Sequence, residues 1–382
     1  MRRVAVIGVG LHAYGKFPDK KPKDLAQVAI DGALTSAGLQ WKDVGSAFVG
    51  HIGLGMTAGA RLLAPIGQTG LSITNVENAS ASGSYALRGA YRDVASGEFE
   101  IAMALGVDML PRKDPTAVSK PAPAVDKPKD GQDKPKPPRS PTAPMLKFAE
   151  DAKAHMRKYG TTLDQLAQVS VKQHYNGARN PYAQYQEEVT LEQVHNARVV
   201  ADPLTVLHCC PFGDGAAAAI VASEDVVRRL GIKHPIWITA SVSQSVRAET
   251  PELTDLTANT AREAYKRAGI SASDVELVEL HDAATIEEIL YAESLGLCAE
   301  GQGGKLVEEG ATAITGRIPI NTSGGLLAMG HPFGPTGIGQ IAEIYWQMRG
   351  EASKRQIPKP PATALAHMIG MGGTCIVHVL QR

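Results

Sequence analysis

The sequence contains little cysteine, few aromatic residues and no excess of either charge. Four cysteines in 382 residues are too few for a disulfide framework, and the adjacent pair Cys209 and Cys210 suits neither an unstrained disulfide nor the usual spacing of a zinc site. With 39 basic and 39 acidic side chains there is no positive surplus to neutralise phosphates, so we expect no nucleic-acid partner. No apolar run approaches the roughly 18 residues of a membrane helix, and the N-terminal run is too short for a signal peptide. These absences predict a cytoplasmic protein with no membrane span.

Apolar runs alternate with helical patterns along the rest of the chain. Strands are predicted at residues 4–9, 47–49, 101–107, 216–221, 236–238, 275–280 and 375–380. Helices are predicted at residues 25–37, 84–95, 142–159, 163–175, 256–268, 286–295 and 338–348. This alternation predicts an α/β fold in which helices cover mixed sheets.

An internal repeat divides the chain into two similar halves. Segments 37–51 and 268–281 each contain an Ala-Gly pair, then an Asp-Val pair, and then a strand that ends in a histidine. Segments 78–80 and 321–323 each begin with asparagine, end with serine, and open a glycine-rich turn into a helix. The sequence therefore predicts duplicated βαβαβ lobes, neither of which closes its core alone.

The lobes are assigned to residues 1–230 and 231–382. Residues 111–144 are rich in proline and lysine and have almost no large apolar side chains, so they are expected to be a solvated insertion in a loop. A basic flap over an anionic ligand is the alternative. Residues 145–200 are expected to be the loop region of the first lobe.

A glycine pattern near the N-terminus imitates a dinucleotide-binding motif. Gly8, Gly10 and Ala13 have the G-x-G-x-x-A spacing, but that motif works only when a helix N-terminus follows at once to hold a pyrophosphate. Here prolines and lysines follow, and no helix is predicted before about Lys23. We therefore predict a glycine-permitted turn after the first strand and no nicotinamide cofactor.

Four segments carry most of the reactive side chains. They are residues 76–84, 280–285, 321–332 and 366–373, which contain Ser80, His281, Gly330, His331, Gly370 and Gly372. Together with Cys-Cys-Pro-Phe-Gly-Asp-Gly-Ala at 209–216 and Leu-Gly-Leu-Cys at 295–298, they resemble the thiolase superfamily, most closely the thiolases related to sterol carrier protein. The matches occur in the family's order over nearly the whole chain except the insertion.

The resemblance implies a thiolase-type architecture, an acyl-CoA thioester as substrate and no other cofactor or metal. It places Ser80 where the family has its nucleophilic cysteine, His331 as the group that activates it, and His281 as a ligand of the thioester oxygen. It also implies that glycines 330, 370 and 372 line the substrate site. A homodimer is expected, and relatives of this type often work with a small zinc-ribbon/OB-fold partner protein.

Two family cysteines are replaced in this chain, by Ser80 and by Ala283. A serine hydroxyl is far less acidic than a thiol and needs a well-placed base to attack a thioester. The first hypothesis is therefore an enzyme that makes or cleaves a carbon–carbon bond in an acyl-CoA. It acts either as a thiolase-like acyltransferase with an acyl group on Ser80, or as an aldolase on a β-hydroxyacyl-CoA. The second is a non-catalytic acyl-CoA- or lipid-binding subunit.

Simpler roles compete for several of these residues. Ser80 suits a helix N-cap, and His51, the repeat counterpart of His281, is expected to be structural or to line the pocket. The acidic residues that follow His281 are expected to be solvated helix charges because no compact set of metal ligands accompanies them. These acidic residues are Asp282, Glu287 and Glu288.

Overall fold

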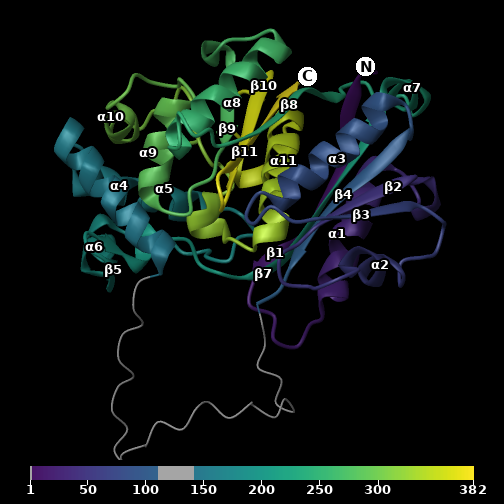
Figure 1. Ribbon diagram of the computed structural model, residues 1–382, viewed down its shortest axis with the longest axis horizontal. Coiled ribbons are helices and arrows are strands. Elements are labelled where there is room, and N and C mark those ends of the chain that lie inside the picture. The colour runs from purple at the N-terminus through teal and green to yellow at the C-terminus, as the bar shows by residue number, and fades with distance from the viewer. Residues whose placement is uncertain (1, 111–141) are drawn as a thin grey trace, which may run out of the picture.

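A computed structural model describes residues 2–110 and 142–382, so most of the predicted insertion lies outside the described residues. A nine-stranded mixed sheet forms the centre, in the order β3-β2-β4-β7-β1-β8-β11-β10-β9 (Figure 1). Its strands are β1 Val4–Gly15, β2 Ser46–Gly50, β3 Ser72–Val76, β4 Ile101–Asp108, β7 Asp214–Ser223, β8 Ile236–Ser245, β9 Leu277–Glu279, β10 Thr363–Gly370 and β11 Thr374–Gln381. A small separate hairpin pairs β5 Val199–Ala201 with β6 Leu204–Thr205.

The helices lie on both faces of this sheet and in a group beside it. They are α1 Pro22–Ala37, α2 Ala58–Leu63, α3 Ser82–Ser96, α4 Ala143–Tyr159, α5 Leu163–Gly177, α6 Leu191–Asn196, α7 Glu224–Arg229, α8 Leu253–Ala268, α9 Thr285–Ser294, α10 Gly303–Glu308 and α11 Phe333–Arg349. Figure 1 shows α4, α5, α6 and α10 together at one side, next to the C-terminal lobe. The expected loop region at 145–200 thus contains three helices.

The strand pairing confirms the predicted duplication. From β1 outward the order is β1, β7, β4, β2 and β3, with two antiparallel pairings followed by two parallel ones. From β8 outward the order is β8, β11, β10 and β9, with the same succession of directions, and a parallel bridge from Val278 to Ile320 takes the place of the fifth strand. The two halves join through the short antiparallel pairing of β1 with β8. The two halves therefore form one continuous sheet.

The repeated helices also end alike. Gly38 follows α1 and Gly269 follows α8, with φ of 66° and 70°, the left-handed conformation that glycine adopts without a steric penalty. The same Ala-Gly pair thus ends the same helix in both lobes. The exact boundary at residue 230 stays a prediction.

The predicted turn at Gly8 and Gly10 is wrong, because β1 continues through both glycines to Gly15. A Cβ on Gly8 would lie 2.5 Å from the carbonyl oxygen of Ala33, and one on Gly10 would lie 2.2 Å from that of Ala29. The glycines thus allow α1 to pack tightly on the strand. A strand in this place leaves no helix N-terminus for a pyrophosphate.

Two helices, α3 and α11, occupy the interior between the half-sheets and contact each other. Their approach is close because Gly83 of α3 and Gly106 of β4 both face the backbone of Gly334 in α11. A Cβ at Gly83 or Gly106 would lie 2.2 or 2.3 Å from the Gly334 carbonyl oxygen. Since α3 and α11 begin at the segments that hold Ser80 and His331, this packing brings the two reactive segments together.

The sequence missed two strands of the central sheet and several short helices. β3 is an edge strand whose side chains are exposed or only partly buried, so it lacks an apolar run. β10 is fully buried, but its Ala, His and Gly residues interrupt the apolar run by which a strand is predicted. Most of it was therefore assigned to the motif at residues 366–373. None of the helices among the described residues is long and apolar enough to cross a membrane.

Candidate active site

Ser80 lies in the turn between β3 and α3 and is buried. Ala79, just before it, has φ of 48°, a left-handed conformation that costs an alanine roughly 1–2 kcal/mol. The hydroxyl that ties this turn together belongs to Ser82, which accepts from the Asn78 amide at 2.9 Å and donates to the Ala79 carbonyl at 2.7 Å. The N-cap residue of α3 is Ala81. The alternative that Ser80 merely caps the helix is therefore wrong.

The hydroxyl of Ser80 instead contacts a histidine from the other lobe. Ser80 Oγ lies 2.9 Å from Nε2 of His331, across 251 positions of sequence. On the opposite side of that ring, Nδ1 lies 3.0 Å from Oγ1 of Thr336. Three side chains thus form one chain of hydrogen bonds.

The direction of each hydrogen bond follows from the last member of this chain. Thr336 donates its single hydroxyl hydrogen to the carbonyl oxygen of Pro332 at 2.6 Å, so towards His331 it can only accept. His331 must therefore carry its proton on Nδ1, which leaves Nε2 as an acceptor for the Ser80 hydroxyl. Burial and the neighbouring His281 hold the pKa of His331 well below its usual value, so the ring is neutral at physiological pH. A neutral acceptor nitrogen facing a serine hydroxyl is the arrangement of a general base and a nucleophile.

The helix that follows Ser80 adds a favourable field. α3 runs for 15 residues from Ser82, and its N-terminus carries a partial positive charge that stabilises a developing negative charge. Gly370 of β10 closes the other side of this turn: a Cβ there would lie 2.5 Å from the Asn78 carbonyl oxygen and 3.3 Å from Cβ of Ala81. The backbone of β10 therefore approaches the serine turn more closely than any side chain would allow.

The other predicted glycines differ in their surroundings. Gly330 is buried, has φ of 105°, and is packed against Gln184, so it shapes the turn just before His331. Gly372 has φ of 96°, is exposed, and has open space where a side chain would be. Gly370 and Gly330 thus lie against the reactive segments, whereas Gly372 faces outward.

His281 lies beside His331, with their rings edge to face and the centroids 5.5 Å apart. It follows β9 and precedes α9, so the end of a strand places it. Its Nδ1 lies 3.1 Å from Oε2 of Glu287, close enough for an ion pair but not aligned for a hydrogen bond, so the carboxylate acts on it electrostatically. Both predicted histidines are thus brought into one site with Ser80.

The prediction of solvated charges beside His281 is wrong. Asp282, Glu287 and Glu288 are all buried, because α9 is enclosed by neighbouring helices on both sides. Asp282 accepts from the Leu326 amide at 2.7 Å, and Glu288 forms an ion pair with Lys172. The helix pattern of residues 286–295 gave no sign of this, because α4 and α5 cover its polar face.

The four cysteines offer no thiolate to this site. Burial raises the pKa of Cys209, Cys298 and Cys375 to about 12, and that of Cys210 well above its usual value. Ala283 is buried in a small apolar cluster with Cys210 and Leu326. Position 283 therefore supplies no acidic or basic side chain of its own.

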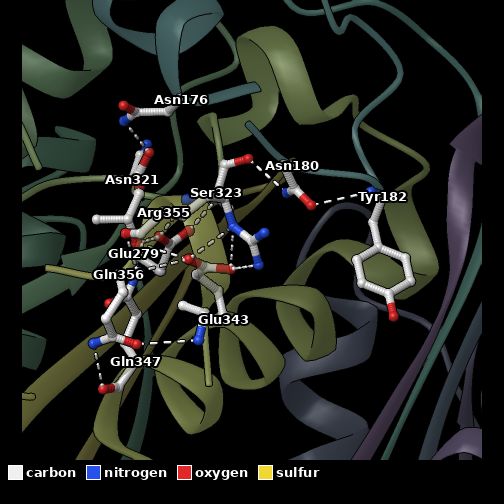
Figure 2. A network of polar contacts seen from close by, with 12 residues as sticks. Asn176, Asn180, Tyr182, Glu279, Asn321, Ser323, Glu343, Gln347, Arg355 and Gln356 are labelled. Carbon is white, nitrogen blue, oxygen red and sulfur yellow. Dashed lines mark hydrogen bonds and ion pairs between the residues drawn. The ribbon is translucent and has the colours of Figure 1, made fainter. Parts of the chain in front are cut away.

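The repeat counterpart of the reactive serine has a different partner. Ser323 donates its hydroxyl to Oε2 of Glu279 at 2.6 Å, in the polar network of Figure 2. Burial and the nearby Glu343 raise the pKa of Glu279 to about 8, while Glu343 itself is paired with Arg355. Asn180 on the adjoining loop donates to the Ser323 carbonyl at 2.7 Å. One serine of the duplicated pair thus faces a base, and the other is held in a structural network.

Sequence reasoning missed several residues that position the site. Thr336 lies just after the segment at 321–332, but only the fold shows that it sets the tautomer of His331. Asp108, at the end of β4, accepts from the amide of Ile52 at 3.0 Å and from that of Gly334, so it links the two lobes beside the site. The sequence offered one sign of this role, because Asp108 is the acidic residue that ends an otherwise apolar strand. His51 is buried, and whether it is structural or lines the pocket stays a prediction.

A cleft of about 600 Å³ opens next to the site between α4, α8 and α9. Phe148, Leu253 and Leu290 supply apolar lining, and the acidic side chains outnumber the lysines around it. Glu287 and Tyr291 line the cleft and face the His281 side of the active site.

Comparison with known proteins identifies the family. The family described as "Thiolase, N-terminal domain" matches residues 4–225, and "Thiolase C-terminal domain-like" matches residues 239–382. This chain belongs to the thiolase family. It is 40% identical to an acetyl-CoA acetyltransferase of Methanothermobacter thermautotrophicus, over all of both chains. It is 37% identical to human sterol carrier protein 2, over 99% of this chain and 71% of that protein.

Solved structures agree on the fold. A structure titled "Ltp2-ChsH2(DUF35) aldolase" superposes with a TM-score of 0.80 at 23% identity, covering 99% of this chain and 97% of that one. An acetyl-CoA acetyltransferase of Syntrophomonas wolfei gives a TM-score of 0.73 at 18% identity, covering 100% and 99%. The predicted thiolase-type α/β fold and the resemblance to sterol-carrier-type thiolases are confirmed.

Proposed function

We propose that this thiolase-family chain is an enzyme that makes or breaks a carbon–carbon bond in an acyl-CoA thioester, with Ser80 and His331 as its proton-transferring pair. The observation that carries this proposal is the 2.9 Å contact between Ser80 Oγ and an Nε2 that Thr336 keeps free of a proton.

In the acyltransferase route the substrate is a β-ketoacyl-CoA. His331 Nε2 takes the Ser80 proton while Oγ attacks the β-carbonyl carbon. The bond between the α- and β-carbons then breaks, its electron pair leaves as the enolate of the CoA ester that keeps the α-carbon, and this enolate takes the proton from the His331 imidazolium. The thiol of coenzyme A then attacks the acyl group on Ser80 and gives its proton to His331, which passes it to the departing Ser80 oxygen. The α3 N-terminus favours the negative charge that develops in this step.

The aldolase route needs no acyl-enzyme and is favoured by the serine at position 80 in place of the family's nucleophilic cysteine. A base removes the hydroxyl proton of a β-hydroxyacyl-CoA, the same carbon–carbon bond breaks to give a carbonyl product and the enolate, and the enolate takes the proton back from that base. Ala283 is buried and supplies no thiol of its own for this exchange. His281 and His331 are the bases at hand.

The test incubates the protein with β-ketoacyl-CoA plus coenzyme A, and separately with β-hydroxyacyl-CoA, and follows the products by mass spectrometry. Ser80→Ala is compared with Ser96→Ala, which removes an exposed hydroxyl from the other end of the same helix. An acyl adduct on Ser80 supports the acyltransferase route, and aldehyde or ketone release without an adduct supports the aldolase route. Binding of acyl-CoA without turnover of either class would favour a non-catalytic acyl-CoA-binding subunit.

Assembly is part of the proposal. The solved relative at TM-score 0.80 is titled as a complex with a DUF35 protein. We propose that this chain forms a homodimer and also works with a small partner protein, so each assay is run with and without candidate partners. Light scattering after size-exclusion chromatography tests the dimer.

A further inference from the structure

Glu287 is a buried carboxyl group that the proposed reaction does not yet use. It lies in the first turn of α9, and its side chain is 5% exposed. Oε2 accepts from the amide of Ala283 at 2.8 Å, while Oε1 accepts from the hydroxyl of Tyr291 at 3.1 Å. These donors stabilise the ionised carboxylate, whose burial without hydrogen bonds would be costly. They also fix where its charge lies.

The fixed charge faces one atom of the site. His281 Nδ1 lies 3.1 Å from Oε2 and has no hydrogen-bond partner among the described residues. A carboxylate oxygen facing a ring nitrogen favours a proton on that nitrogen, since a lone pair there would be repelled. The opposite nitrogen, Nε2, is then left without a proton in the neutral ring. It can accept a proton there but cannot donate to the thioester oxygen, so this role differs from the one that the family resemblance implies for His281.

We propose that Glu287 is a positioning residue that holds the proton of His281 on Nδ1, so that Nε2 serves as the proton acceptor in carbon–carbon bond cleavage. The reaction itself rests on the proposed function, whereas the tautomer does not. In the aldolase route, the substrate hydroxyl gives its proton to Nε2, the bond between the α- and β-carbons breaks, and its electron pair forms the enolate. Glu287 then stabilises the imidazolium that results, without touching substrate.

Other titratable groups face this pair from each neighbouring element. His331 and His367 lie near His281, and around Glu287 are Asp151 of α4, Tyr291 of α9, and Cys209 and Cys210. Burial holds the pKa of His331 and of His367 well below the usual value, the latter at about 3, so neither competes as a cation at neutral pH. Burial raises the pKa of Tyr291 and of both cysteines, so these groups stay uncharged.

The cleft between α4, α8 and α9 provides a control residue for this carboxylate. Glu287 lines the cleft from α9, although only 5% of its side chain is exposed. Glu293 lines the same cleft two turns later on α9 and lies 3.2 Å from a different histidine, His155. It is therefore a matched control for Glu287.

The first experiment needs no substrate. Protein labelled with ¹⁵N-histidine is studied by NMR near neutral pH, and the ring signals of His281 are assigned by their loss in His281→Gln. We expect a proton on Nδ1 in the wild type and in Glu293→Leu. In Glu287→Leu no oxygen faces Nδ1, so the preference for a proton on that nitrogen should be lost and the Nε2–H form should appear. An Nδ1–H tautomer retained in Glu287→Leu, with native circular dichroism, overturns the inference.

The second experiment uses the substrate found in the tests above. Glu287→Leu should lower kcat about 10–100-fold, the usual cost of removing a group that orients a catalytic one, while KM changes by less than about threefold. A kcat equal to that of Glu293→Leu overturns the inference. If no acyl-CoA is turned over but the tautomer moves as expected, the proposed function fails and the positioning role of Glu287 stands.

Discussion

Replacing Thr336 with valine removes one hydroxyl and tests the hydrogen-bond chain at the active site. Valine keeps the shape of threonine but cannot accept from His331 Nδ1, which lies 3.0 Å from Oγ1. In a fully enclosed position, an unpaired N–H costs about 1–3 kcal/mol. The ring avoids this cost by moving its proton to Nε2, where it donates to Ser80 and no longer accepts. Since about 1.4 kcal/mol corresponds to a factor of ten, kcat should fall about 10–100-fold.

The assay measures initial rates on the acyl-CoA substrate for wild type, Thr336→Val and Thr336→Ser. Serine retains the hydroxyl, so Thr336→Ser should keep most of the activity. Thr336→Val also loses the hydrogen bond to the Pro332 carbonyl, which lowers its stability. Thermal unfolding followed by circular dichroism measures this loss, so that it is not mistaken for a loss of catalysis. A folded Thr336→Val enzyme with the kcat of the wild type would refute the argument that Thr336 sets the tautomer of His331.

Three further predictions test the packing, the buried carboxyl group and the reactive position. Gly83→Ala should lower the free energy of unfolding by about 1–3 kcal/mol, because the added methyl would lie 2.2 Å from the Gly334 carbonyl oxygen. Urea titrations measure this change, and unchanged stability would show that α3 and α11 separate readily. Glu279, whose pKa is raised from 4.5 to about 8, binds a proton on folding, so its stabilisation is present at low pH and is lost as pH rises through that window. Glu279→Gln should therefore gain stability relative to wild type by up to about 1.4 kcal/mol per pH unit across it, and a pH-independent difference would contradict the shift. In Ser80→Cys, iodoacetamide should alkylate the new thiol next to His331 quickly, while the native cysteines react slowly because burial raises their pKa values. Peptide mass spectrometry compares the labelling rates. Equal labelling of all the cysteines would refute an activating His331.

The sequence was informative where local pattern and tertiary role coincide. The Ala-Gly ends of α1 and α8 and the echo of residues 78–80 at 321–323 predicted a duplicated fold, and the strand directions confirm it. Strands such as β4 and β7 are buried on both faces and so read as continuous apolar runs. β3 escaped notice because an edge strand needs no such run.

The candidate site was only partly accessible from sequence. Motifs named Ser80, His281 and His331, but nothing local distinguished a capping serine from one that faces a base. That distinction depends on His331 arriving from the other lobe, through the glycine contact of α3 with α11. Glu287 was misjudged for the same reason, since the charge pattern of a helix does not show which neighbours cover it.

The amino-acid sequence by itself determined the fold class, the duplication and the absence of cysteine at positions 80 and 283, and its resemblance to the thiolases named the candidate site residues. These follow from periodicity, repeats and motifs, which are local properties of the chain. Only the tertiary structure decided the direction of the hydrogen bond from Ser80 to His331, the burial of Glu287 against His281, and the different partners of the duplicated serines. Each of these depends on atoms far apart in sequence, whose distances are set by the packing of two half-sheets around α3 and α11.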